Sequence, residues 1–97
     1  MAKYRKRPIV IEAKQWMPIV TGSDVEAVEY PHDWGNIGSQ TCNDCGCKLE
    51  EHGWIETREG GHIVCHGDWI IEGIEGEFYP CKPSIFGKTY EKVEEEG

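Results

Sequence analysis

Residues 42–68 read CNDCGCKLEEHGWIETREGGHIVCHGD and hold four of the five cysteines and three of the four histidines of the chain. The stretch begins with a Cys-x-x-Cys turn and continues in a pattern that predicts a β-hairpin. Thiolates and imidazoles are the ligands that zinc prefers in structural sites, which commonly take two ligands from one such turn. We therefore expect one Zn²⁺ ion to join the turn to the hairpin.

The turn offers Cys42 and Cys45, and Gly46 directly after them suits a turn whose backbone amides face the thiolates. The hairpin region offers four candidates for the remaining two positions, namely His52, His62, Cys65 and His66. In the predicted hairpin, His62 lies at the closed end and residue 65 follows it by roughly 10 Å at the usual rise per residue. One zinc ion cannot readily bind both.

The position of the hairpin loop ranks the candidates. With a loop centred near Glu59 and Gly60, Cys65 faces Trp54 across the ladder, and His52 lies just beyond it at the open end. The chain arrives at this open end from the Cys-x-x-Cys turn. The predicted zinc ligands are therefore Cys42, Cys45, His52 and Cys65.

Two alternatives stay open within the zinc site, with His66 as a reserve for the fourth ligand and Cys47 as a reserve for the turn. The competing interpretation has no metal: Cys65 is then a small buried thiol, His52 a surface residue, and the cysteines of the turn a reactive loop. A zinc ion with four protein ligands has no position for an activated water, so the predicted site stabilises the fold rather than catalysing a reaction.

The whole pattern favours an α+β fold that is mainly β, as a small antiparallel sheet or barrel in a meander with one or two short helices and a zinc-stapled loop. We expect residues 1–97 to form a single domain. Alternation and glycine turns predict strands over residues 4–16, 53–57, 62–65, 69–72, 77–79 and 90–93. The capping-box spacing of Ser23 and Glu26 predicts a short helix over residues 25–30, and Pro83 opens a second helical turn. Residues 32–41 are predicted to be an irregular loop.

The composition is that of an ordinary globular protein with a formal net charge of −8. This acidity disfavours general binding to a nucleic-acid backbone, although four basic residues lie within residues 3–7. Only three apolar residues separate this basic opening from Glu12, too few for a secretory signal or a membrane span. We therefore expect a cytoplasmic protein, in which an odd number of cysteines is held free or bound to metal.

Four stretches of the chain share one further pattern, namely KYRKRPIVIEA at 3–13, HGWI at 52–55, GDWIIEG at 67–73 and GEFYPCKP at 76–83. Together they resemble a family of small, largely uncharacterised bacteriophage and prophage proteins. The family's first turn often reads Pro-Gly-Asp-Trp or Pro-Gly-Asp-Tyr, and residues 17–40 have no counterpart in it. The resemblance implies a phage protein that acts in the cytoplasm of a bacterial host.

The resemblance also bears on individual residues. Family members usually have proline where this chain has His66, which weakens His66 as a ligand. Some members lack the Cys-x-x-Cys insert but keep a cysteine like Cys81, which implies that Cys81 lies outside the metal site. Where the family often has aspartate after Lys-Pro, this chain has Ser84, another plausible cap for the helical turn.

Two functions of different classes fit these features. The first is a non-enzymatic phage accessory protein with a structural zinc site, which binds a host or phage protein. The second is a nucleotide or small-ligand binding protein that sequesters a host defence signal, using the aromatic residues Trp54, Trp69 and Tyr79 with the basic opening. Catalysis is the least favoured, because Cys65 and His66 are neighbours on a strand and point to opposite faces.

Overall fold

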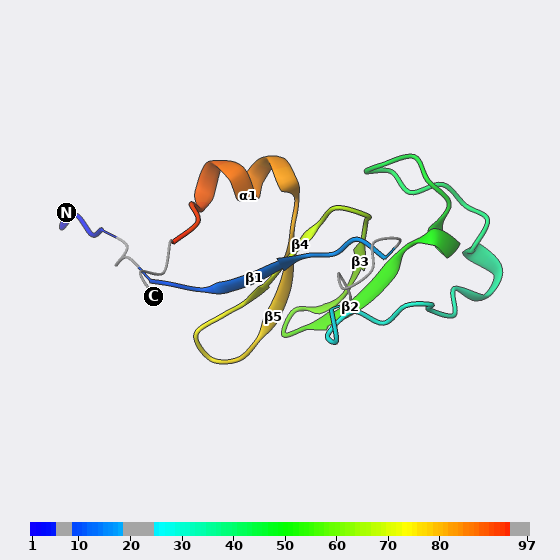
Figure 1. Cartoon of the computed structure of the whole chain (residues 1–97), viewed down its shortest axis with the longest axis horizontal. Coiled ribbons are helices and arrows are strands. Elements are labelled where there is room, and N and C mark those ends of the chain that lie inside the picture. The colour runs from blue at the N-terminus through cyan, green and yellow to red at the C-terminus, as the bar shows by residue number, and fades with distance from the viewer. Residues whose placement is uncertain (6–8, 19–24, 94–97) are drawn as a thin grey trace.

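The structure, a computed structural model, describes residues 1–5, 9–18 and 25–93. Its elements in chain order are the strand β1 (Glu12–Gln15), the 3-10 helices η1 (Gly35–Ile37) and η2 (Leu49–Glu51), the strands β2 (Gly53–Thr57), β3 (Gly60–Val64), β4 (Trp69–Glu72) and β5 (Phe78–Cys81), and the helix α1 (Pro83–Thr89). In Figure 1, α1 lies beside β1, β4 and β5, and the long segment that carries η1 and η2 lies at the opposite side of the hairpin.

The strands form two open antiparallel sheets, one with the order β1-β4-β5 and the other the hairpin β2-β3. The mainly β, α+β prediction is confirmed in its open-sheet form, but the predicted meander is wrong because β4 pairs with β1 and β5 and not with β3. The turn after β3 explains the difference. Trp16 N donates to Asp68 O at 2.8 Å and Gly67 N donates to Trp16 O at 2.8 Å, so the end of β1 takes the place beside β4.

A core of buried hydrophobic side chains joins the two sheets, and its members are Trp16, Val28, Ile55, Val64 and Ile70. Along β2, Ile55 is buried and Glu56 is exposed, as expected for a strand with one face on the core. Gly53 permits this packing, because a Cβ at this position would overlap Val28 and press on the indole of Trp16. The hairpin therefore approaches the core with its backbone.

The predicted hairpin is confirmed with its first strand as expected, but its second strand covers Gly60–Val64 rather than 62–65, so the loop is tighter. Thr57 pairs with Gly60, so the loop is only Arg58 and Glu59, and Trp54 faces Ile63 rather than Cys65. This shift of two residues keeps every side chain on its predicted face because the period of a strand is two. Continuing the observed register by one residue beyond Gly53 and Val64 places His52 opposite Cys65.

Two predictions in the first third of the chain are wrong. The first strand covers only Glu12–Gln15 rather than 4–16, of which residues 6–8 lie outside the described residues. No helix forms over residues 25–30, and Ser23 of the expected capping box also lies outside the described residues. The backbone of Glu29 instead pairs with Trp54, with N···O distances of 2.7 and 3.0 Å, because this pairing buries Val28 in the core.

The C-terminal part contains the predicted helical turn but not the strand predicted over 90–93, where the described residues form no regular structure. Tyr90 N donates to Phe86 O at 2.9 Å, so the helical hydrogen bonding ends there. The Phe86 ring stacks on Trp69 of β4 with a centroid distance of 4.2 Å. This contact holds α1 against the three-stranded sheet.

Candidate metal centre

The Cys-x-x-Cys turn is closed by its own backbone. Cys42 N donates to Cys47 O at 2.7 Å, and Gly46 N donates to Cys42 O at 2.9 Å. Gly46 has a φ of +79°, a conformation that favours glycine, which explains its place in the turn. The amide of Asp44 points at the sulfur of Cys42, with an N···Sγ distance of 3.4 Å. The turn therefore presents its first thiol among backbone donors, as predicted.

The short helix η2 positions His52. Its backbone N–H donates to Leu49 O at 2.9 Å, and the ring Nδ1 lies 2.8 Å from Lys48 O. A carbonyl oxygen only accepts, so Nδ1 carries the proton and the lone pair of Nε2 is left for another partner. Nε2 lies 3.0 Å from Cys45 Sγ, and the side chain is only 1% exposed. This orientation, fixed by a backbone carbonyl, is typical of a metal-ligating histidine.

Cys65 completes the cluster from the end of β3. Its Sγ lies 3.7 Å from Cys42 Sγ, and the four candidate ligand atoms of Cys42, Cys45, His52 and Cys65 all lie within 4.8 Å of one another. Four sulfur ligands about 2.3 Å from a tetrahedral zinc ion would stand roughly 3.8 Å apart. The sulfur separation fits that geometry and is far beyond a disulfide bond, and all five cysteines are free. The structure thus brings together the predicted residues in a cluster that could hold a metal ion.

The two buried thiols have different environments. Burial acts to raise the pKa of Cys42, but hydrogen bonds from the backbone of Cys45 and Asp44 and from the thiols of Cys65 and Cys45 together leave the pKa below its usual value. Burial raises the pKa of Cys65 to about 12. Cys42 thus lies among groups that favour its thiolate, whereas burial disfavours the thiolate of Cys65.

A buried carboxylate, that of Asp68, binds the backbone N–H of Cys65. Asp68 is 2% exposed, and its Oδ2 accepts the backbone N–H of Cys65 at 3.0 Å. Lys82 Nζ lies 3.2 and 3.1 Å from the two oxygens of Asp68 and 3.7 Å from Oδ2 of Asp44 in the Cys-x-x-Cys turn. Burial acts to lower the pKa of Lys82, but the side chains of Cys65 and Asp68 raise it above its usual value. One ammonium group therefore connects the turn, the end of β3 and the start of α1.

The sequence reasoning missed these supporting residues. Asp68 follows Cys65 by three positions, and an aspartate that accepts a nearby backbone N–H is a recognised turn signal that could have identified it. Nothing in the sequence pattern points to Lys82. Trp34 and Ile63 also pack against the cluster of Cys42, Leu49 and Cys65, a contact between segments far apart in the chain.

The other cysteines and histidines considered from the sequence lie outside the cluster that the described residues form. Cys47 is exposed, and His62 pairs with Ile55 in the hairpin ladder. His66 Nε2–H donates to Glu51 O at 2.6 Å. Cys81 Sγ lies 3.7 Å from Lys82 O. The two alternative ligands, His66 and Cys47, are therefore not part of the cluster.

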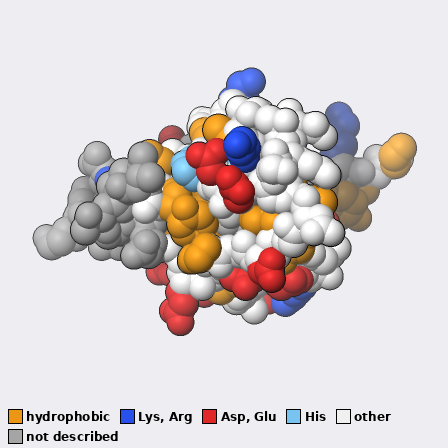
Figure 2. All heavy atoms as spheres, turned by 90° about the vertical axis from the view of Figure 1, so that its right-hand side faces the viewer, with side chains coloured by type: hydrophobic (Ala, Val, Ile, Leu, Met, Phe, Trp, Pro, Cys, Tyr) orange, Lys and Arg blue, Asp and Glu red, His pale blue; other side chains and the backbone are white. Residues whose placement is uncertain are grey.

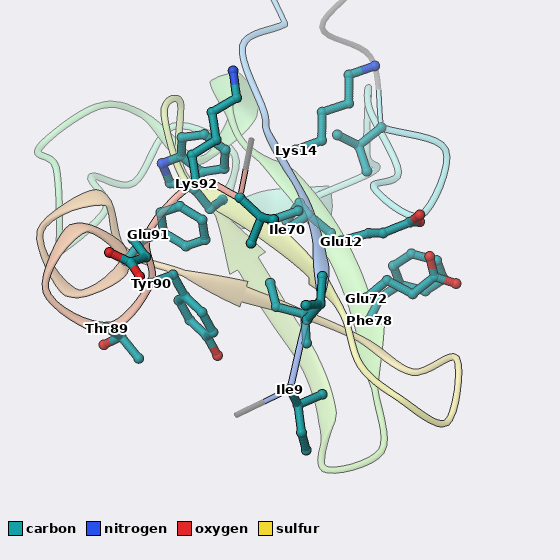
Figure 3. Close-up of a pocket in the computed structure, with 17 residues that line it drawn as sticks. Ile9, Glu12, Lys14, Ile70, Glu72, Phe78, Thr89, Tyr90, Glu91 and Lys92 are labelled. Atoms are coloured by element: carbon teal, nitrogen blue, oxygen red, sulfur yellow. The ribbon is translucent and has the colours of Figure 1, made fainter. Parts of the chain in front are cut away.

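A groove lies apart from this cluster, beside β1, β4 and the segment after α1, with a volume of about 1100 Å³. In Figure 3, side chains from the sheet and from residues that follow α1 border the same hollow. Its apolar lining includes Ile9, Val10, Trp69, Phe78, Phe86 and Tyr90. Val10 is 76% and Ile9 46% exposed, so the part of the lining beside β1 is open to a partner or ligand.

The side of the molecule that carries η1 and η2 is of mixed character. Figure 2 shows acidic and hydrophobic side chains side by side on it, with basic side chains scattered rather than gathered into one patch. Among the described side chains visible on this side, no concentrated positive charge faces a nucleic-acid backbone, in keeping with the net charge of −8.

Comparison of the chain with protein-family models, with curated proteins and with solved structures finds no significant match. Within the described part of the chain, no helix has the length and apolar character needed to cross a bilayer. The resemblance to small phage proteins therefore stays a prediction that the quoted motifs carry.

Proposed function

We propose that Cys42, Cys45, His52 and Cys65 bind one Zn²⁺ ion that stabilises the fold. The observation that carries this proposal is the convergence of four ligand atoms within 4.8 Å, with the Nδ1–H of His52 donating to Lys48 O so that Nε2 faces the cluster. Thiolate and imidazole ligands together select zinc over harder cations such as Mg²⁺ or Ca²⁺. Four protein ligands close the site, so the ion has a structural role.

Metal analysis of protein purified without added zinc tests this assignment. We expect one zinc per chain, lost in the variant Cys42→Ser and retained in Cys47→Ser, which changes an exposed cysteine of the same turn. Protein without stoichiometric zinc, whose melting is unchanged by a chelator, would contradict the proposal.

We further propose that the protein is a non-enzymatic phage accessory protein that acts in the host cytoplasm as a protein-interaction module. The groove supports this function, because the apolar side chains of Ile9 and Val10 are exposed beside a three-stranded sheet. A closed metal site and the resemblance to small phage proteins are consistent with it. The partner is a host or phage protein.

Affinity capture from an infected host extract, with two matched variants, tests the groove as the binding surface. Val10→Asp places a charge in the groove, and Ile74→Asp places one in the turn after β4, at a residue that does not line the groove and is 71% exposed. We expect wild type and Ile74→Asp to retain the same partner and Val10→Asp to lose it. A partner retained equally by all three proteins would remove the groove from the proposal.

The second candidate, a nucleotide or small-ligand binding protein, is favoured by the aromatic lining of the same groove. Trp69 lines it beside Phe86, whereas Trp54 is stacked on His32 at a centroid distance of 5.1 Å and is engaged within the fold. A thermal-shift screen against nucleotides separates the two functions. Stabilisation by a nucleotide in wild type and its loss in Val10→Asp would favour the ligand binder, and no stabilisation by any nucleotide would favour the interaction module.

A further inference from the structure

Lys82 lies where it can act on the metal centre without being a ligand. Its Nζ contacts both oxygens of Asp68, and Oδ2 of the same carboxylate accepts the backbone N–H of Cys65. Nζ also lies 3.7 Å from Asp44, inside the Cys-x-x-Cys turn. One cation therefore faces a candidate ligand and the turn that carries two others.

The charge of the proposed site makes this cation significant. Three thiolates and a neutral imidazole leave a bound Zn²⁺ with a net charge of −1, which adds to the charges of Asp68 and Asp44. Because three of the four ligands are buried, solvent screens this negative charge only in part. Outer partners of this kind change metal affinity by about 10- to 100-fold when removed.

We propose that Lys82 is a positioning residue that balances the negative charge of the zinc-thiolate centre and couples metal binding to the placement of α1. This inference rests on the proposed zinc site. Lys82 directly precedes Pro83 at the start of α1, and its carbonyl oxygen accepts Phe86 N–H at 2.8 Å. Phe86 in turn stacks on Trp69, and both rings line the groove.

Linkage makes the coupling reciprocal. If the docked ammonium of Lys82 raises zinc affinity by some factor, bound zinc must favour the docked position of Lys82 by the same factor. The start of α1 is fixed by that docking, so zinc loading also fixes one wall of the groove. A structural metal thereby controls the surface that we assign to partner binding.

The test compares wild type with Lys82→Met, Lys82→Arg and the control Lys88→Met on the exposed part of α1. Zinc affinity is measured by competition with a chromophoric chelator. We expect Lys82→Met to weaken binding about tenfold, with Lys82→Arg restoring most of the affinity and Lys88→Met leaving it unchanged. In the cobalt-substituted protein, Lys82→Met shifts the thiolate-to-cobalt charge-transfer band, a change that loss of stability alone does not produce.

Lys82→Met leaves a buried carboxylate unpaired, so the double variant Lys82→Met with Asp68→Asn guards against a folding defect. Its zinc affinity stays below that of Asp68→Asn alone if Lys82 acts on the thiolates. Amide exchange at Phe86 and Tyr90 measures the coupling, and we expect zinc to slow it in wild type and in Lys88→Met but not in Lys82→Met.

The outcomes separate this inference from the proposed function. Wild type that binds neither zinc nor cobalt overturns the metal site itself. Two results would overturn the role of Lys82 but not the metal site. One is a wild type that binds zinc no more tightly than Lys82→Met, and the other is a wild type whose amide exchange in α1 is the same with and without zinc.

Discussion

The candidate metal centre and the groove are built from different contacts. At the metal centre, Cys42, His52 and Cys65 are buried, and backbone hydrogen bonds hold the Cys-x-x-Cys turn and the ring of His52 in place. Apart from the buried Ile70, the groove is bordered mainly by exposed or half-buried apolar side chains, and a ring stack between Trp69 and Phe86 holds α1 beside it. The contacts of the candidate metal centre stabilise the fold, whereas the groove leaves apolar surface exposed. We therefore expect substitutions at the two regions to differ in size and in their dependence on zinc.

The largest expected effect is at the metal centre. Replacing Cys42 with serine should remove the ion and destabilise the protein by about 4 kcal/mol, because metal binding contributes folding free energy directly. Urea unfolding with and without a chelator measures this loss. In the variant, the chelator should have no further effect, and Cys47→Ser should behave as wild type. Equal stability of Cys42→Ser and wild type would break the distinction between the two regions.

The second largest effect is expected at Gly53, which directly follows His52 and packs against the core. Gly53→Ala places a methyl group against Val28 and Trp16, and such overpacking should cost about 2–3 kcal/mol. Thermal unfolding of the zinc-loaded protein measures this change. Zinc stoichiometry should stay at one per chain, because His52 is positioned by η2 rather than by residue 53. Loss of zinc along with stability would mean that the core and the metal centre form one unit.

A smaller effect is expected at the groove. Phe86→Ala removes the ring that stacks on Trp69 and should cost about 1–2 kcal/mol, since Phe86 is only half-buried. Zinc content should not change. The free energy of unfolding from urea titration gives the magnitude, and a cost as large as that of Cys42→Ser would show that the groove is a core and not an open surface.

The smallest effect should be stabilising. Gly87 lies inside α1 with open space around the position of a Cβ, so alanine should raise stability by about 0.5–1 kcal/mol through helix propensity. Gly87→Ala is the matched control for Gly53→Ala, because the same substitution is expected to change stability in the opposite direction. Thermal unfolding of both variants in one buffer checks the pair, and destabilisation by Gly87→Ala would indicate a contact on that side of α1.

Parts of the fold with a local cause were predictable. The hairpin, β4 and the helical turn after Pro83 follow from alternation, glycine turns and proline placement, and the four clustered residues follow from spacing and hairpin geometry. The failures share one cause, which is competition from distant segments. Residues 25–30 have a helical pattern, but pairing of Glu29 with Trp54 and burial of Val28 outweigh it.

The sequence by itself determined that the Cys-x-x-Cys turn meets the open end of the hairpin, because strand period and a short turn restrict where thiols and imidazoles can meet. It left His66 and Cys47 as alternative ligands, and the structure places His52 rather than either of them in the cluster. Only the tertiary structure decided that β1 lies beside β4 and that a groove opens next to α1. It also decided that Asp68 accepts the backbone N–H of Cys65 while pairing with Lys82. Ligand spacing is a local property of the chain. Pairing between strands and ion pairs over many residues depend on which distant surfaces bury one another, and no local pattern encodes that choice.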